Sequence, residues 1–281
     1  MEGDKHQVAL FIDVQGDISV LLKSAVSLAQ IINAEIQVVH VTKPTAVVKK
    51  ENQQSAIRSM NQEYIQTDKR INDIVSPLIE KYGVPIKYSS TFGNTKNEID
   101  RYINENDPDF LVLGRRNGKS FFTATDSIIS YVLKVFKGTV LIVSNNNGLG
   151  PGQKIGIGSL NCSEALFNTS FMENLFFHAK STLKSFNIVK TTEDLSQTGS
   201  FLGRKTINFV FDHNENTVKK LPSYLSKSNI DLLFLEGRRK EKESLSRLLN
   251  VYDMVKKSDI NLLIAGKKHS RYNFNPKLRI T

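Results

Sequence analysis

Asp109-Phe110-Leu111-Val112-Leu113-Gly114-Arg115-Arg116-Asn117-Gly118 is the stretch of sequence that decides the fold. An apolar run that ends in a glycine turn is typical of a buried strand that leads through a loop into a helix. The pattern recurs, with one extra residue, at Ile230-Asp231-Leu232-Leu233-Phe234-Leu235-Glu236-Gly237-Arg238-Arg239. A repeat of this length predicts a tandem duplication.

In both copies, apolar residues at helical spacing and then a short apolar strand follow the turn. The helical residues are Ile128, Ile129, Val132, Leu133 and Phe136 in the first copy and Leu245, Leu248, Leu249, Tyr252 and Val255 in the second. The strands that follow are residues 139–143 and 260–264. We therefore predict a first domain over residues 1–146, a linker over 147–152, and a second domain over 153–281 that ends in a basic tail.

The first half alternates strands with helices, which predicts a doubly wound parallel sheet of five strands. The predicted strands are residues 7–14, 36–41, 84–88, 109–114 and 139–143, and the predicted helices are 18–34, a long one from about 57 to 78, 94–104 and 127–136. The long helix has one apolar face (Ile57, Met60, Tyr64, Ile71, Ile74 and Leu78), and Pro77 is expected to kink or shorten its end.

The second half restarts the pattern with a strand at residues 154–159 and an aromatic-rich helix at 164–185. Strands at 186–189 and 206–211 and a helix at 217–226 follow. Only a short polar connection stands where the first half has its long helix, so the second copy is predicted to lack that element.

Composition excludes several classes of function. Hydrophobic residues make up 40% of the chain and charged residues 23%, as in globular proteins, and no apolar run approaches the roughly 20 residues that span a bilayer. The acidic N-terminus is unlike a signal peptide and Cys162 is the single cysteine, so we expect a cytoplasmic protein. The net charge of +10 is spread along the chain, which argues against DNA or a membrane as a partner.

The sequence resembles the universal stress protein family in its tandem, two-domain form. The resemblance is carried by Asp13 at the end of the first strand, Val41 near the end of the second, and a glycine-rich signature that begins at Gly114. It implies two Rossmann-like domains, similar to the adenine nucleotide alpha hydrolase fold. It also implies a site for ATP or AMP with magnesium, in which Asp13 lies near the base, the Val41 backbone contacts the nucleotide, and the signature holds the phosphates.

The signature departs from the family pattern at two of its four positions. Family members place glycine where this chain has Asn117 and Gly-Ser or Gly-Thr where it has Asp126-Ser127. Asparagine tolerates positive φ and Gly118 follows directly. A carboxylate about 4 Å from a phosphate charge costs about 4 kcal/mol at an effective dielectric constant near 20, unless magnesium or basic side chains offset it.

Asp126 and the two arginines that follow Gly114 each have an alternative interpretation. Asp126 could instead cap the helix that follows it. Arg115 and Arg116 could clamp phosphates or could simply be solvated. In the site that the resemblance implies, the first domain therefore contributes Asp13, Val41, Gly114, Arg115, Asn117, Gly118, Asp126 and Ser127.

The second half keeps little of this site. Gly158 or Ser159 replaces the acid of the first strand, and Glu236 is inserted before the glycine turn. The five histidines show no metal-ligand spacing, and we find no nucleophile with a general base, so neither a metal site nor a catalytic residue is predicted.

The leading hypothesis is a non-enzymatic tandem universal stress protein in stress response, with at most a degenerate adenine-nucleotide site in the first domain. The alternatives are an ATP or AMP sensor and a protein-interaction scaffold without a small ligand. The family pairs its domains through their last strands, which implies that residues 140–144 run antiparallel to 261–265 within this chain. A homodimer of tandem chains and other protein partners stay open.

Overall fold

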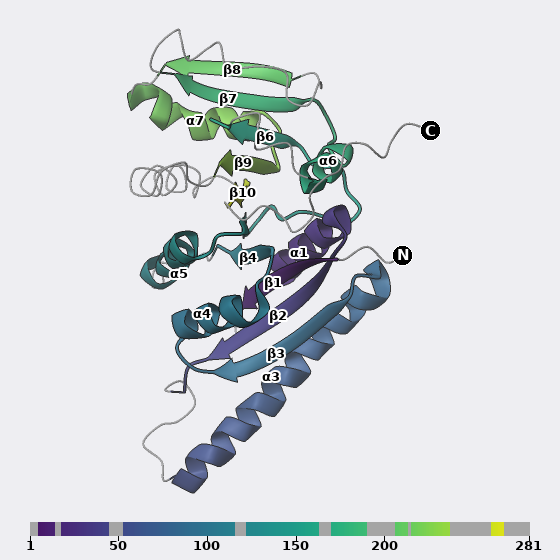
Figure 1. The fold of residues 1–281 in the computed structure, drawn as a ribbon, viewed down its shortest axis with the longest axis vertical. Coiled ribbons are helices and arrows are strands. Elements are labelled where there is room, and N and C mark those ends of the chain that lie inside the picture. Colours follow the sequence, from purple (N-terminus) through teal and green to yellow (C-terminus); the bar gives the residue numbers. More distant parts are fainter. Residues whose placement is uncertain are drawn as a thin grey trace.

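The computed structural model describes residues 5–14, 18–44, 53–115, 122–162, 170–189, 206–212, 215–236 and 260–266. Over these residues the strands form one ten-stranded sheet in the order β3-β2-β1-β4-β5-β10-β9-β6-β7-β8, which confirms the predicted α/β class (Figure 1). The strands are β1 (His6–Ile12), β2 (Ala34–Thr42), β3 (Ile86–Phe92), β4 (Phe110–Gly114), β5 (Thr139–Val143), β6 (Ile157–Leu160), β7 (Leu183–Val189), β8 (Thr206–Asp212), β9 (Leu232–Glu236) and β10 (Asn261–Ala265). The helices are α1 (Ser19–Ile32), α3 (Gln53–Tyr82), α4 (Thr95–Asn106), α5 (Phe122–Val135), α6 (Ser170–Phe177) and α7 (Glu215–Lys227).

The first half of the sheet is doubly wound. Strands β3, β2, β1, β4 and β5 are neighbours in that order and all pair in parallel. The chain passes from β1 through α1 to β2 on one side, and from β3 through α4 to β4 on the other. The topological switch point, where such sheets bind their ligands, therefore lies between β1 and β4.

The second half repeats this order as β8, β7, β6, β9 and β10, again with parallel pairing. One detail shows the duplication at the level of atoms. The backbone N–H of Asp109 donates to Gln7 O and its Oδ2 accepts from Gln7 N, both at 3.0 Å. Asp231 makes the same two bonds with Gly156, at 2.8 and 2.6 Å. Each aspartate thus ties the start of one central strand to the start of its neighbour.

The two halves meet where β5 runs antiparallel to β10. Leu262 lies opposite Ile142, Leu263 opposite Leu141, and Ile264 opposite Val140, as the last-strand prediction required. All of these side chains are buried. The seam between β5 and β10 thereby removes two apolar strand edges that would otherwise be open to aggregation.

A hydrophobic core continues across this seam on each face of the sheet. On one face, α1 and α3 of the first half share a cluster with α6 of the second, and Phe110 meets Phe171 edge to face at 5.3 Å between ring centroids. On the other face, α4 and α5 share a cluster with α7. Separating the halves would therefore expose apolar surface on both faces.

The predicted linker packs against α1. The Leu149 N–H donates to Ser24 Oγ at 2.9 Å, and Ser27 Oγ donates to the Gly150 carbonyl at 3.2 Å. A Cβ at Gly148 would lie 2.5 Å from Val20 Cγ1, so only glycine fits that close to the helix. The segment therefore fixes the two halves to each other and is not a free tether.

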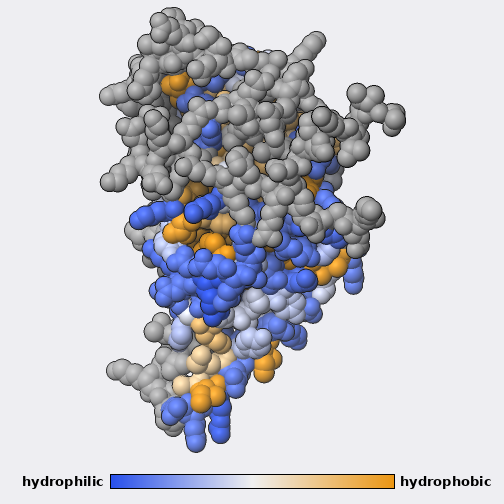
Figure 2. All heavy atoms as spheres, viewed as in Figure 1, coloured by the Kyte–Doolittle hydropathy of each residue, from blue (hydrophilic) through white to orange (hydrophobic). Residues whose placement is uncertain are grey.

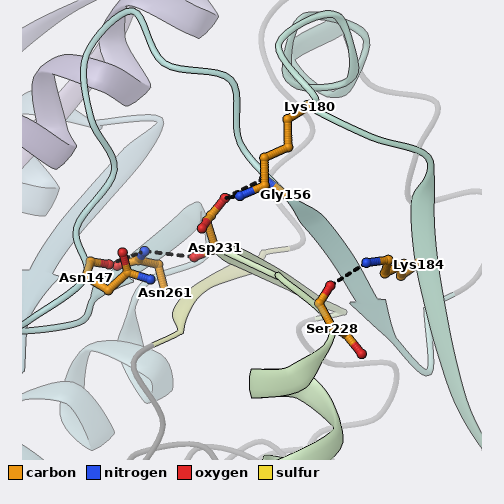
Figure 3. Close-up of polar contacts among 7 residues, drawn as sticks. All are labelled: Asn147, Gly156, Lys180, Lys184, Ser228, Asp231 and Asn261. Atoms are coloured by element: carbon orange, nitrogen blue, oxygen red, sulfur yellow. Dashed lines mark hydrogen bonds and ion pairs between the residues drawn. The ribbon is translucent and has the colours of Figure 1, made fainter.

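Asn261, at the start of β10, is fully buried and connects three segments (Figure 3). Its Nδ2 donates to the carbonyls of Asn147 and Asp231, each at 2.8 Å, and its Oδ1 accepts from the Ser144 N–H at 2.8 Å. Asp231 also accepts from Lys180 Nζ at 2.7 Å. One amide side chain thus holds the linker, the end of β5 and the start of β9 together.

Helix α3 differs from the prediction in two ways. It continues through Pro77 to Tyr82 and so is not shortened at the proline; Pro77 and Asp73, the residue whose carbonyl loses its N–H partner, are both exposed to solvent. The predicted apolar face is buried only in part: Ile71 is in the core, whereas Ile57 and Tyr64 are 52% and 46% exposed.

The predicted helix over residues 164–185 is wrong at its C-terminal end. Helix α6 ends at Phe177, and Ala179 then forms a bridge with Ile155. Strand β7 already begins at Leu183. Residues 163–169 and the second-half helix predicted around Leu245 to Val255 lie outside the described residues, as does the polar connection of residues 190–205.

The substitution Leu263→Lys tests the seam. Leu263 is 0% exposed, and an uncompensated buried charge costs about 3–5 kcal/mol, so we expect a large fall in the melting temperature of the whole chain. Val210→Lys on β8 is the control, because Val210 is 43% exposed and should tolerate the charge. Equal melting of the two variants would contradict the seam.

The substitution Asn261→Ala tests the polar connection. It removes three buried hydrogen bonds, and we expect it to lower the free energy of unfolding by about 1–3 kcal/mol in urea denaturation. Asn208→Ala, at an exposed position on β8, is the matched control and should leave the midpoint unchanged.

The Tyr102 phenol should titrate late. Burial against the sheet, followed by the negative charge of Glu35, raises its pKa from 10.0 to about 12. The folded state then binds the proton more tightly than the unfolded state, so this contribution to stability is complete below pH 10 and is lost as the pH rises towards 12. Tyr102→Phe should remove this late step from an absorbance titration of the tyrosines; a titration curve identical to that of the unmodified protein would contradict it.

Candidate functional site

The carboxyl ends of β1, β2 and β4 bring three predicted site residues to one edge of the sheet. Ile12 pairs with His40, so Asp13 and Val41, the next residues of the two strands, are neighbours. Gly114 ends β4, on the other side of β1. Asp13 and Gly114 therefore flank the switch point between β1 and β4, where a nucleotide would bind in this type of fold.

His40 is a site-edge residue that the sequence interpretation missed. Its ring is buried, with Nδ1 3.1 Å from the Ile12 carbonyl and Nε2 3.0 Å from Thr42 Oγ1. A carbonyl can only accept, so Nδ1 carries a proton. The imidazole thus joins the ends of β1 and β2 and fixes the spacing of the two residues beside it, Asp13 and Val41. In the sequence, His40 is only a histidine near the end of a predicted strand. That position does not indicate a role until the pairing of β1 with β2 is known.

Gly114 has a packing role in addition to any role in binding. A Cβ at this position would lie 3.2 Å from Leu21 Cδ2 of α1. The glycine therefore lets α1 pack closely against the end of β4.

Arg115 is directed to the seam. It is 9% exposed, its backbone N–H donates to the Val143 carbonyl at 3.0 Å, and its guanidinium donates to the Ile260 carbonyl at 2.7 Å. The interpretation of Arg115 as a solvated side chain is wrong, because the side chain is buried and donates to a protein carbonyl. That carbonyl belongs to Ile260, which precedes β10 in the other half of the chain. In this structure the side chain connects the two halves.

The remaining signature positions are described only in part. Asn117, Gly118 and Arg116 lie outside the described residues. Asp126 and Ser127 lie within α5, and their side chains are outside the described part of the chain. Because α5 begins at Phe122, Asp126 is an interior residue of the helix, and the interpretation of Asp126 as its N-cap is wrong.

The pairing register identifies the equivalent positions in the second half. Strand β6 pairs with β9 as β1 pairs with β4, which places Cys162, and neither Gly158 nor Ser159, at the position of Asp13. Glu236 pairs with Ala265 as Gly114 pairs with Val143, so it occupies the position of Gly114 and is not an insertion within the strand.

By the same register, Ile188 takes the place of Val41. The second edge therefore has a thiol where the first has a carboxylate, and a carboxylate where the first has a glycine. Cys162 is half-buried there, with Sγ 3.4 Å from the carbonyls of Leu160 and Phe234.

Two further observations concern other classes of site. Within the described ranges, no group of three or more His, Cys, Asp or Glu side chains is placed to hold a metal ion. No helix in the same part of the chain is long and apolar enough to span a bilayer.

Comparison with known proteins agrees with this architecture. The model of the universal stress protein family matches residues 17–144. No curated protein sequence matches the chain. A universal stress protein from Archaeoglobus fulgidus DSM 4304 has a similar structure, with a TM-score of 0.67 and 14% identity over 92% of this chain and 96% of that one.

Two further solved structures share the fold along almost the whole chain. A functionally unknown protein from Pseudomonas aeruginosa PAO1 has a TM-score of 0.59 and 12% identity over 94% of this chain and 93% of that one. The cytoplasmic domain of a prokaryotic cation chloride cotransporter has a TM-score of 0.51 and 14% identity over 95% of this chain and 97% of that one. At these identities the likeness concerns the fold. Residues 17–144 match the universal stress protein family, and the chain shares the fold of these solved structures, with two five-stranded halves joined in one sheet.

Proposed function

We propose that this protein is a non-enzymatic stress-response protein that binds an adenine nucleotide at a single site, in its first half. The observation that carries the proposal is the asymmetry of the two carboxyl edges. The first edge retains Asp13, Val41 and Gly114 around the switch point, whereas the register places Cys162 and Glu236 at the positions of Asp13 and Gly114.

The first carboxyl edge has groups suited to bind a nucleotide, whereas the second has a charge that repels phosphates. A carboxylate such as Asp13 accepts hydrogen bonds from ribose hydroxyls or a base amine, and a glycine turn lets backbone N–H groups approach phosphates. Glu236, at the position of Gly114, brings a negative charge to the place of the phosphates. At about 4 Å and an effective dielectric constant near 20, that repulsion costs about 4 kcal/mol for each phosphate charge.

The residues of the first half could hold ATP or AMP, with magnesium bridging the phosphates. Asp126 adds a negative charge on α5, so magnesium would have to offset it. Arg115 is not part of the proposed phosphate contacts, since its guanidinium is bonded to the Ile260 carbonyl. We place the domain limits at residues 1–146 and 153–281, with the second domain serving as the permanent partner of the first.

Thermal unfolding with ATP and magnesium tests the proposal. At a ligand concentration of one hundred times the dissociation constant, we expect stabilisation of about 2.7 kcal/mol. Asp13→Asn should abolish this gain, whereas Cys162→Ser at the equivalent position of the second half should retain it.

Two outcomes would contradict parts of the proposal. If ATP, AMP and magnesium leave the melting temperature unchanged, nucleotide binding is excluded. An interaction scaffold without a small ligand is then the remaining function. Steady release of phosphate from ATP, lost in Asp13→Asn, would show that the protein is an enzyme.

A further inference from the structure

The apolar stripe of α3 extends beyond the sheet that it covers. Thr67, Ile71 and Val75 are buried against the core. Towards the start of the helix, Ile57, Tyr64 and Ile65 are 52%, 46% and 67% exposed. In Figure 1 this end of α3 projects past the sheet, and Figure 2 shows hydrophobic side chains at the same end of the molecule among hydrophilic ones.

The exposed residues form a ridge on one side of the helix. Ile57, Asn61 and Ile65 are spaced by four residues, the spacing of the ridges that interlock when two helices pack. At about 100° per residue, Tyr64 and Asp68 fall on the same side, within an arc of roughly 100°. The ridge therefore has an apolar residue at each end and an amide at its centre.

We propose that this ridge binds the same ridge of a second copy of the chain, with the two α3 helices antiparallel and the two-fold axis at Asn61. In that arrangement Ile57 packs against Ile65 of the second copy, and Ile65 against its Ile57. The two Asn61 amides meet at the axis, where each can donate to the other. A single amide in an otherwise apolar helix contact fixes the register of the pair.

Charge selects the antiparallel arrangement. Arg58 lies on the N-terminal side of Asn61 and Asp68 on the C-terminal side. Antiparallel helices place Arg58 about 6 Å along the axis from Asp68 of the second copy, within reach of an extended arginine side chain. Parallel helices would place Arg58 beside Arg58. The macrodipoles of two antiparallel helices also attract each other.

The contact between the two helices is small, so we expect the dimer to be weak. The part of α3 that carries the ridge, residues 54–68, is about 22 Å long. A single helix pair of this length buries less surface than a standard stable interface of about 1,600 Å². The dimer is therefore concentration-dependent, and it is independent of nucleotide binding at the carboxyl edge.

Cysteine crosslinking tests the register directly. In a Cys162→Ser background, Asn61→Cys places two thiols at the proposed axis, and mild oxidation should yield a covalent dimer of twice 31.6 kDa. Gln66→Cys is the matched control, since Gln66 is exposed on the opposite side of α3 and should stay monomeric. Equal crosslinking at the two positions, or none at Asn61→Cys, would overturn the proposal.

Sedimentation of the otherwise unmodified chain supplies an independent test. Arg58→Asp should weaken self-association at least about tenfold without lowering the melting temperature, because the side chain is exposed. Adding Asp68→Arg should restore it by exchanging the two charges. A chain that remains monomeric at its highest soluble concentration, or a double variant as weak as the single one, would overturn the pairing.

Discussion

The antiparallel hydrogen bonding of β5 to β10 is the interaction on which the rest of the structure depends. It closes the inner edge of each half, and it brings together the helices that complete the core on each face of the sheet. Polar contacts around this pairing also connect the two halves. Asn261 connects the linker to both last strands, and Arg115 reaches the carbonyl that precedes β10. The seam is therefore maintained by the backbone, the cores and specific polar groups together.

The sheet was largely predictable because its central strands are buried on both faces. A continuous apolar run such as residues 139–143 has few alternatives, and β5 has those bounds in the structure. Helix ends were less predictable. The apolar residues after Phe177 fit a helix as well as a strand, and the bridge from Ile155 to Ala179 decides between them. That contact joins residues far apart in the sequence, so no local pattern records it.

Some residues of the candidate site were predictable from the sequence and others were not. Asp13, Val41 and Gly114 were predictable as neighbours, since parallel strands bring their carboxyl ends to one edge. The roles of His40 and Arg115 were not, because each depends on a carbonyl supplied by a distant strand or the adjoining half. The second half shows the limit most clearly: the glycine pattern suggested an insertion at Glu236, whereas the register shows a substitution.

The docked linker has a thermodynamic consequence for how the two halves could diverge. When a partner is attached through a short connection, its effective concentration is of millimolar order whatever the concentration of the protein in solution. The second half therefore stays beside the first at any dilution, whereas two separate domains would dissociate when diluted. Under that condition Cys162 and Glu236 can stand at the positions of Asp13 and Gly114 without weakening the seam, because neither residue belongs to β5 or β10.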